Sequence, residues 1–237
     1  MMQKSLFLVL FFVACTSVVS AEGVLQAEGL SEGSTIIWFR GSRIETTFDG
    51  TQELRGTLEL GITEYSFAVA GSAYGAGTAD ANTLQATLWV LVRVSGTLEG
   101  GTPITIRGGM NVGGEDIDMD SLSLGAGGGT FFFIVDLFGS SYEFKGTIDS
   151  TATGTLVPPE IPSTMEVAGR VDSTFEGSLH ESTGELVERL PWDVSSWPQK
   201  LHEQLITLLL TGVMPERTIE QPETEPERPP ARQPPPP

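Results

Sequence analysis

The segment from Leu84 to Leu98 places an apolar residue or a glycine at every second position, and this alternation constrains the fold more than any other feature. A period of two is typical of a β-strand with one buried face. Shorter copies of the pattern run from Leu54 to Leu60 and from Tyr142 to Ile148, while signals for helices are nearly absent between Gly23 and Leu190. We expect further strands at Thr35–Arg40, Arg43–Phe48, Tyr65–Ser72, Ile104–Arg107, Thr130–Phe138, Thr151–Val157, Met165–Val171 and Thr174–His180.

A short motif recurs in these segments: an apolar residue, any residue, glycine, threonine or serine, and a second apolar residue. The copies centre on Gly56, Gly96 and Gly146, with looser ones at Gly169 and Gly177. Each glycine lies on the apolar face, where a missing side chain lets a strand coil tightly or lets a neighbour approach closely. The motif therefore predicts strongly curved strands.

Short turn-like sequences separate the strands, and short turns imply antiparallel pairing. We expect turns at Asp49-Gly50, Gly100-Gly101 and Gly113-Gly114, and longer mobile loops of small residues at Ala73–Thr83 and Gly125–Gly129. The predicted fold is all-β: an antiparallel meander that forms a curved β-sandwich or barrel over residues 22–190.

The residue pattern changes after Leu190, from alternating strand-like segments to a helical segment and a Pro-rich tail. Residues 191–214 are expected to contain one amphipathic helix, with Ser196 as its cap, Gly212 as its stop, and an apolar face that docks on the β domain. That face comprises Trp197, Leu201, Leu205, Leu208 and Leu209. Residues 215–237 are dense in Pro and Glu and are expected to be a disordered tail.

The first 21 residues resemble an export signal. They combine Lys4, an apolar run from Leu6 to Ala14 that is too short to span a bilayer, and small residues ending at Ala21. The minority interpretation is a lipobox that ends at Cys15, in which case this residue would be lipidated and would anchor the chain to a membrane. We therefore expect an exported protein, periplasmic or secreted, with an outer-membrane or lipid-anchored location as the alternative.

The formal net charge of −18 limits the partners of the chain. Such an acidic surface repels phosphate backbones, so we expect no nucleic acid partner. No transmembrane helix is expected either, because the apolar stretches are too short. The expected partner is an apolar ligand or an unidentified component of the cell envelope.

Few residues indicate a metal-binding or catalytic site. Asp116, Asp118 and Asp120 would share one face of an extended segment and form a weak candidate calcium site; no other cofactor is expected. The two histidines, His180 and His202, have no closely spaced partner, and no nucleophile elbow of the Gly-x-Ser-x-Gly type is present. We therefore assign no catalytic residue, and enzymatic activity is uncertain but not favoured.

The leading interpretation is an exported, non-enzymatic β domain with a binding or structural role, whose curved interior would suit an apolar ligand. In outline this is similar to a lipocalin, but the Gly-x-Trp signature of that family is absent, since Gly33 and Trp38 are too far apart. The alternative is a small outer-membrane β-barrel. An extracytoplasmic hydrolase ranks third. A histidine beside a serine or carboxylate in a cleft would indicate this function.

Overall fold

The computed structural model describes residues 23–83, 85–114, 123–158, 164–182, 190 and 196–216. These residues form eight long strands and one helix, in the order β1 Gly23–Arg40, β2 Arg43–Leu60, β3 Thr63–Asp80, β4 Gln85–Leu98, β5 Pro103–Gly114, β6 Ser123–Leu137, β7 Ser140–Val157, β8 Met165–Glu181 and α1 Gln199–Thr211. In the part of the chain that is described, no helix has the length and apolar character needed to cross a membrane.

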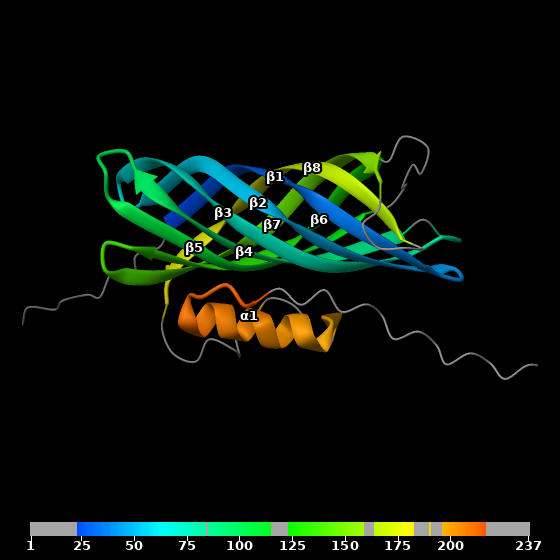
Figure 1. The fold of residues 1–237 in the computed structure, drawn as a ribbon. Helices are drawn as coiled ribbons and strands as arrows, with labels where there is room; N and C mark the ends of the chain where they lie inside the picture. Colours follow the sequence, from blue (N-terminus) through cyan, green and yellow to red (C-terminus); the bar gives the residue numbers. More distant parts are fainter. Residues whose placement is uncertain are drawn as a thin grey trace, which may run out of the picture.

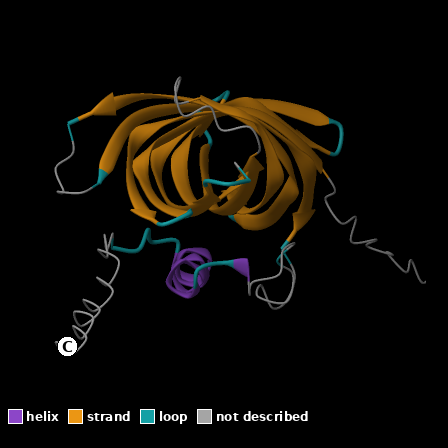
Figure 2. Ribbon diagram, turned by 90° about the vertical axis from the view of Figure 1, so that its right-hand side faces the viewer, coloured by secondary structure: helices purple, strands orange, loops and turns teal. Residues whose placement is uncertain are grey.

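The eight strands form one antiparallel meander that closes on itself (Figures 1 and 2). Each strand pairs with its neighbours in sequence, and β8 returns to pair with β1 from Leu179 opposite Gly23 to Met165 opposite Ile37. The all-β antiparallel fold predicted from the sequence is confirmed, and of the two predicted shapes the barrel is the one observed. Closure pairs the first strand with the last, which removes the open sheet edges that promote aggregation.

The alternation in the sequence separates the inside of the barrel from the outside. In β4 the side chains of Val90, Val92 and Val94 belong to the interior core, whereas Trp89 and Leu91 lie in a second apolar cluster on the outer wall. The three consecutive phenylalanines of β6 divide in the same way. Phe131 and Phe133 point inward, Phe132 points outward, and all three are fully buried.

Four of the five motif glycines, all except Gly169, lie where adjacent strands approach too closely for a side chain. A Cβ atom added to Gly56 would meet the backbone of Ala27 at 2.8 Å, and one added to Gly96 would meet Val69 Cα at 3.0 Å. Both positions face the interior, next to the large side chains that fill it. The predicted link between this motif and tightly curved, closely packed strands agrees with this geometry.

Four of the expected connections lie in strands instead. Asp49-Gly50 lies in the middle of β2, the segment Ala73–Thr83 is mostly the second half of β3, Gly113-Gly114 forms the end of β5, and Gly125–Gly129 belongs to β6. The expectation of turns and mobile loops there was wrong, because in this barrel small residues mark close approach and not a break. A Cβ added to Gly50 would meet Gly33 Cα, on the paired strand β1, at 2.8 Å.

Helix α1 lies along the outside of the barrel beside β4 and β5 (Figures 1 and 2). Its predicted apolar face is confirmed, because Leu201, Leu205, Leu208 and Leu209 pack with Trp197 against the outer aromatic cluster. Gly212 ends the helix in the left-handed conformation with φ 69°, as predicted. The predicted N-cap was wrong: the cap residue is Pro198, which makes no side-chain cap hydrogen bond, and Ser196 lies outside the helix.

Two arginines of the barrel wall bind the C-terminal end of α1. Arg93 Nε donates a hydrogen bond to Gly212 O at 2.6 Å, and Arg107 Nε donates one to Leu209 O at 3.3 Å. Arg107 also forms an ion pair with Asp136. Burial, followed by the nearby charge of Arg93, lowers the pKa of Arg107. The helix has no basic residue in its last turn, so the barrel supplies the positive charge that a helix C-terminus favours.

Replacing one of these arginines should loosen the helix and leave the barrel intact. Arg107→Met keeps most of the apolar stem but removes a charged donor, which contributes about 1.5–3 kcal/mol in partly buried settings. We expect hydrogen–deuterium exchange over Gln199–Thr211 to become roughly tenfold faster. Arg55→Met, at an exposed ion pair with Glu53, is the matched control and should leave this exchange unchanged. Equal exchange in both variants would contradict a clamping role.

Candidate functional site

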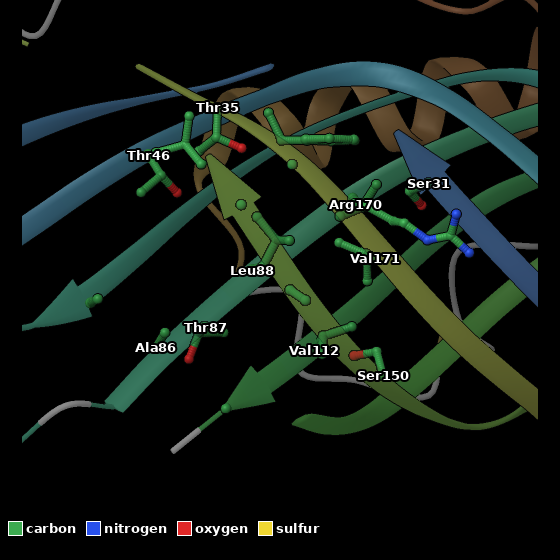
Figure 3. A pocket seen from close by; sticks show the side chains of 18 of the residues that line it. Ser31, Thr35, Thr46, Ala86, Thr87, Leu88, Val112, Ser150, Arg170 and Val171 are labelled. Carbon is green, nitrogen blue, oxygen red and sulfur yellow. The ribbon is translucent and has the colours of Figure 1, made fainter. Parts of the chain in front are cut away.

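A cavity of about 230 Å³ occupies the half of the barrel that ends at the β1–β2 turn (Figure 3). Its wall comes from β1, β2, β3, β4, β5, β7 and β8, and its chemistry is mixed. Apolar side chains such as Phe48, Leu88 and Val112 form most of it, and the hydroxyls of Thr35 and Thr46 lie nearer the mouth. This cavity, which opens inside the barrel and is lined by seven of its strands, is the candidate site.

The opposite half of the barrel is filled by aromatic rings, which close the cavity from below. Phe131 is central, with ring centroids 4.4 Å from Phe144, 5.1 Å from Phe133 and 5.4 Å from Phe175. All four rings are almost completely buried. Tilted and edge-on contacts of this kind pack tightly. The barrel is therefore solid at one end and hollow at the other.

A layer of polar side chains separates the aromatic floor from the hollow half. Ser31, Ser150 and Ser173 line the cavity, and each is at least nine-tenths buried. Ser31 Oγ donates a hydrogen bond to Oε1 of Gln52 at 2.5 Å, and Gln52 is only 1% exposed. Gln52 Nε2 in turn donates to the backbone oxygen of Glu53 at 3.0 Å. Buried polar groups of this kind must be satisfied by partners, so their placement constrains what else can share the cavity.

Among the described lining residues, Arg170 is the one that carries a charge. Its guanidinium is turned to carboxylates outside the cavity: it contacts Asp172 at 2.7 Å and Glu32 at 3.8 Å. The hydrogen bond between Arg170 and Asp172 raises the pKa of the arginine and lowers that of the aspartate. The described interior of the cavity is therefore neutral, and the guanidinium of Arg170 is paired on the outer side of the wall.

None of the candidate functional residues that sequence analysis singled out is among the described residues that line this cavity. Asp116, Asp118 and Asp120, the candidate calcium ligands, and Cys15, the candidate lipidation site, fall outside the described residues. Within the described ranges, no three His, Cys, Asp or Glu side chains gather closely enough to hold a metal ion. The candidate calcium site thus remains a sequence prediction.

Neither histidine lies in the barrel interior: His180 is on the outer face of β8 and His202 is in α1. His180 Nε2 is 3.0 Å from Ser178 Oγ, two residues away on the same face of β8. A hydrolase was expected to have a histidine beside a serine, with both in a cleft. The contact between His180 and Ser178 meets the first condition, but neither residue lines the described cavity. A Ser–His contact on an outer wall, away from the described cavity, does not provide a cleft in which a substrate could be held.

The serines and Gln52 were missed by sequence reasoning, although a signal was present. Ser31, Ser150 and Ser173 each occupy a position where the two-residue period predicts an inward side chain. A polar residue at an inward position is the informative exception in a buried strand. No known protein family matches this sequence, and no curated protein is significantly similar to it. The functional argument therefore rests on the geometry of the barrel.

Proposed function

We propose that this chain is an exported, non-enzymatic barrel that binds a small, largely apolar molecule in its hollow half. The observation that carries the proposal is the contrast between the two halves of one interior. The floor is packed with four phenylalanines, whereas the other half leaves about 230 Å³ unfilled. Eight-stranded barrels normally fill their interior with side chains or hold one small ligand there, and the hollow half lacks those packing contacts. A ligand would recover those contacts.

The outer wall supports a barrel that works in water. Every second residue of β2 from Arg43 to Glu59 is charged or a threonine, and these positions face away from the core. An outer-membrane barrel needs an outward apolar band about 25 Å tall. The outward apolar residues of β4 and β6, including Trp89 and Phe132, are instead covered by α1. The membrane barrel remains the alternative, and it would stay with membranes until detergent is added.

Export is proposed from the signal-like residues 1–21. Cleavage after Ala21 would release a periplasmic or secreted protein, and lipidation at Cys15 would tether the same barrel to a membrane surface. Both outcomes place the barrel in an aqueous compartment outside the cytoplasm, where an apolar metabolite needs a carrier or a sink. The ligand-binding proposal is independent of which outcome holds.

The size of the cavity limits the ligand. A cavity of about 150 Å³ accepts benzene, and drug-sized ligands occupy at least about 300 Å³, so 230 Å³ suits about ten non-hydrogen atoms. If each of its non-hydrogen atoms contributes about −0.7 to −0.8 kcal/mol, a value within the range for small ligands, a ligand of that size binds with a Kd on the order of micromolar to tens of micromolar. The proposal is thus a small apolar molecule and not a full-length fatty acid or phospholipid.

A series of 1-alkanols from 1-butanol to 1-dodecanol tests the proposal by isothermal titration calorimetry. Each added methylene should strengthen binding about fourfold while the chain still finds unfilled space. The gain should stop near 1-nonanol, where the estimated capacity of about ten non-hydrogen atoms is reached. A heat signal with one site per chain and this cutoff supports a finite internal cavity.

Two outcomes contradict the proposal. If no alkanol binds, the hollow half is not a ligand site. If affinity keeps rising through 1-dodecanol without a cutoff, the alkanols are binding to an exposed surface and not inside the barrel.

A further inference from the structure

We infer that the ligand carries an uncharged hydrogen-bonding group, such as a hydroxyl, at its buried end. This inference rests on the proposed function and adds the ligand class to it. The inference is based on a layer of buried polar side chains beneath the cavity. A site that binds only hydrocarbons has no use for such side chains. The layer consists of Ser31, Gln52, Ser150 and Ser173, and each member is at least nine-tenths buried.

The backbone register brings these side chains together. Ser150 of β7 is directly opposite Ser173 of β8, and Ser173 is in turn opposite Gly29 of β1. Ser31 is the next inward residue after Gly29. Three hydroxyls from three adjacent strands therefore converge on one region of the cavity wall, with the side chain of Gln52 behind Ser31.

The layer lies at the deep end of the cavity. A Cβ added to Gly29 would come within 2.6 Å of the Phe175 ring and 3.0 Å of Gln52 Nε2, so the amide and the aromatic floor meet at this glycine. The threonines that line the cavity near the strand ends, such as Thr46, are only half buried. A molecule entering from the mouth would therefore place its leading end against the serines.

The hydroxyls can still bond to a ligand. Ser31 uses its proton on Gln52, which leaves the lone pairs of its oxygen as acceptors. Ser150 Oγ reaches the oxygen of Gly127 only at 3.5 Å, the weak end of the hydrogen-bond range, so a closer acceptor would compete for its proton. A ligand hydroxyl can donate to one serine and accept from another. A hydroxyl therefore matches this layer better than a group that only accepts.

Charge at the buried end of the ligand is disfavoured. Among the described lining residues, the one cation close to the serines in sequence register is Arg170, and its exposed guanidinium is bound to Asp172 and Glu32 on the outer side of the wall. Burying a carboxylate without a paired cation is strongly unfavourable. An apolar end is disfavoured for another reason, because it would cover the hydroxyls without replacing their hydrogen bonds. The neutral hydroxyl avoids both penalties.

Three ligands of equal length test the inference: 1-hexanol, 1-chlorohexane and hexanoate, measured with wild type and with Ser173→Ala and Ser150→Ala. Each serine variant should weaken binding of 1-hexanol about three- to tenfold, the usual effect of one lost hydrogen bond. Binding of 1-chlorohexane should stay the same or strengthen, since it makes no such bond. Hexanoate should bind wild type at least about tenfold more weakly than 1-hexanol.

Ser178→Ala is the matched control, because Ser178 is on the same strand but on the outer wall, beside His180. It should change none of the three affinities. The inference is overturned if the serine variants affect 1-hexanol and 1-chlorohexane equally, if they affect neither, or if hexanoate binds as well as 1-hexanol. Failure of all three ligands to bind wild type would instead overturn the proposed function, so the two failures are distinguishable.

Discussion

Gly146→Ala is expected to lower the free energy of unfolding by about 3 kcal/mol, the upper part of the range for overpacking a core. A Cβ at this position would overlap the backbone oxygen of Glu176 and lie 2.6 Å from Gly177 Cα, both on the paired strand β8. Backbone atoms of a closed barrel cannot move aside without disturbing several strands. Urea denaturation followed by circular dichroism measures the change.

Gly169→Ala provides the matched control. Gly169 occupies the same position in a copy of the same motif and faces the interior, yet an added Cβ would meet its nearest atom, Thr153 O, at an ordinary 3.5 Å. Neither glycine has a positive φ, so backbone conformation does not distinguish them. Replacing Gly169 should change stability by less than about 1 kcal/mol, and the reduced entropy of the unfolded chain favours the alanine. If the two variants had the same urea concentration at the midpoint of unfolding, close strand approach would not explain the motif.

The alternation of side chains was sufficient to predict the fold class, but the lengths of the strands were underestimated. Leu84–Leu98 corresponds closely to β4, because an uninterrupted period of two has one structural solution. β1 to β3 are each much longer than expected. β2 and β3 contain Gly50 and Gly75, at positions where the sequence predicted a turn and a loop. In a barrel these glycines permit close pairing, a tertiary requirement that local sequence does not reveal.

The candidate site was less predictable than the fold. Asp116 and its neighbours were predicted as calcium ligands because carboxylates are well-known metal ligands. A cavity, however, is made by residues that are too small to fill it, such as Ala86 and Gly114, and no motif marks such residues. The charged residues within strands were equally hard to interpret from sequence. Arg93 and Asp136 belong to the network that holds α1, a role that requires knowledge of where the helix docks.

Thr46→Trp should reduce binding of 1-octanol more than about 100-fold, the loss expected when the space for the ligand is occupied. Thr46 lines the cavity, and its inward neighbours along β2 are the buried Ile44 and Phe48 (Figure 3). An indole there is about as large as the ligand that the cavity can hold. Because it fills unoccupied space, the variant should unfold at an equal or higher urea concentration than wild type. Val112→Trp blocks the cavity from β5 and should give the same loss.

Thr47→Trp separates blocking of the cavity from a general effect of tryptophan. Thr47 is the next residue of β2 and has similar burial, but it belongs to the outward row of polar side chains. It should bind 1-octanol as wild type does. If Thr46→Trp and Thr47→Trp weaken binding equally, the alkanol does not occupy the hollow half. If Thr46→Trp alone loses binding while its stability is retained, the unfilled half of the barrel is a ligand site, and the volume left above the phenylalanine floor exists for an occupant.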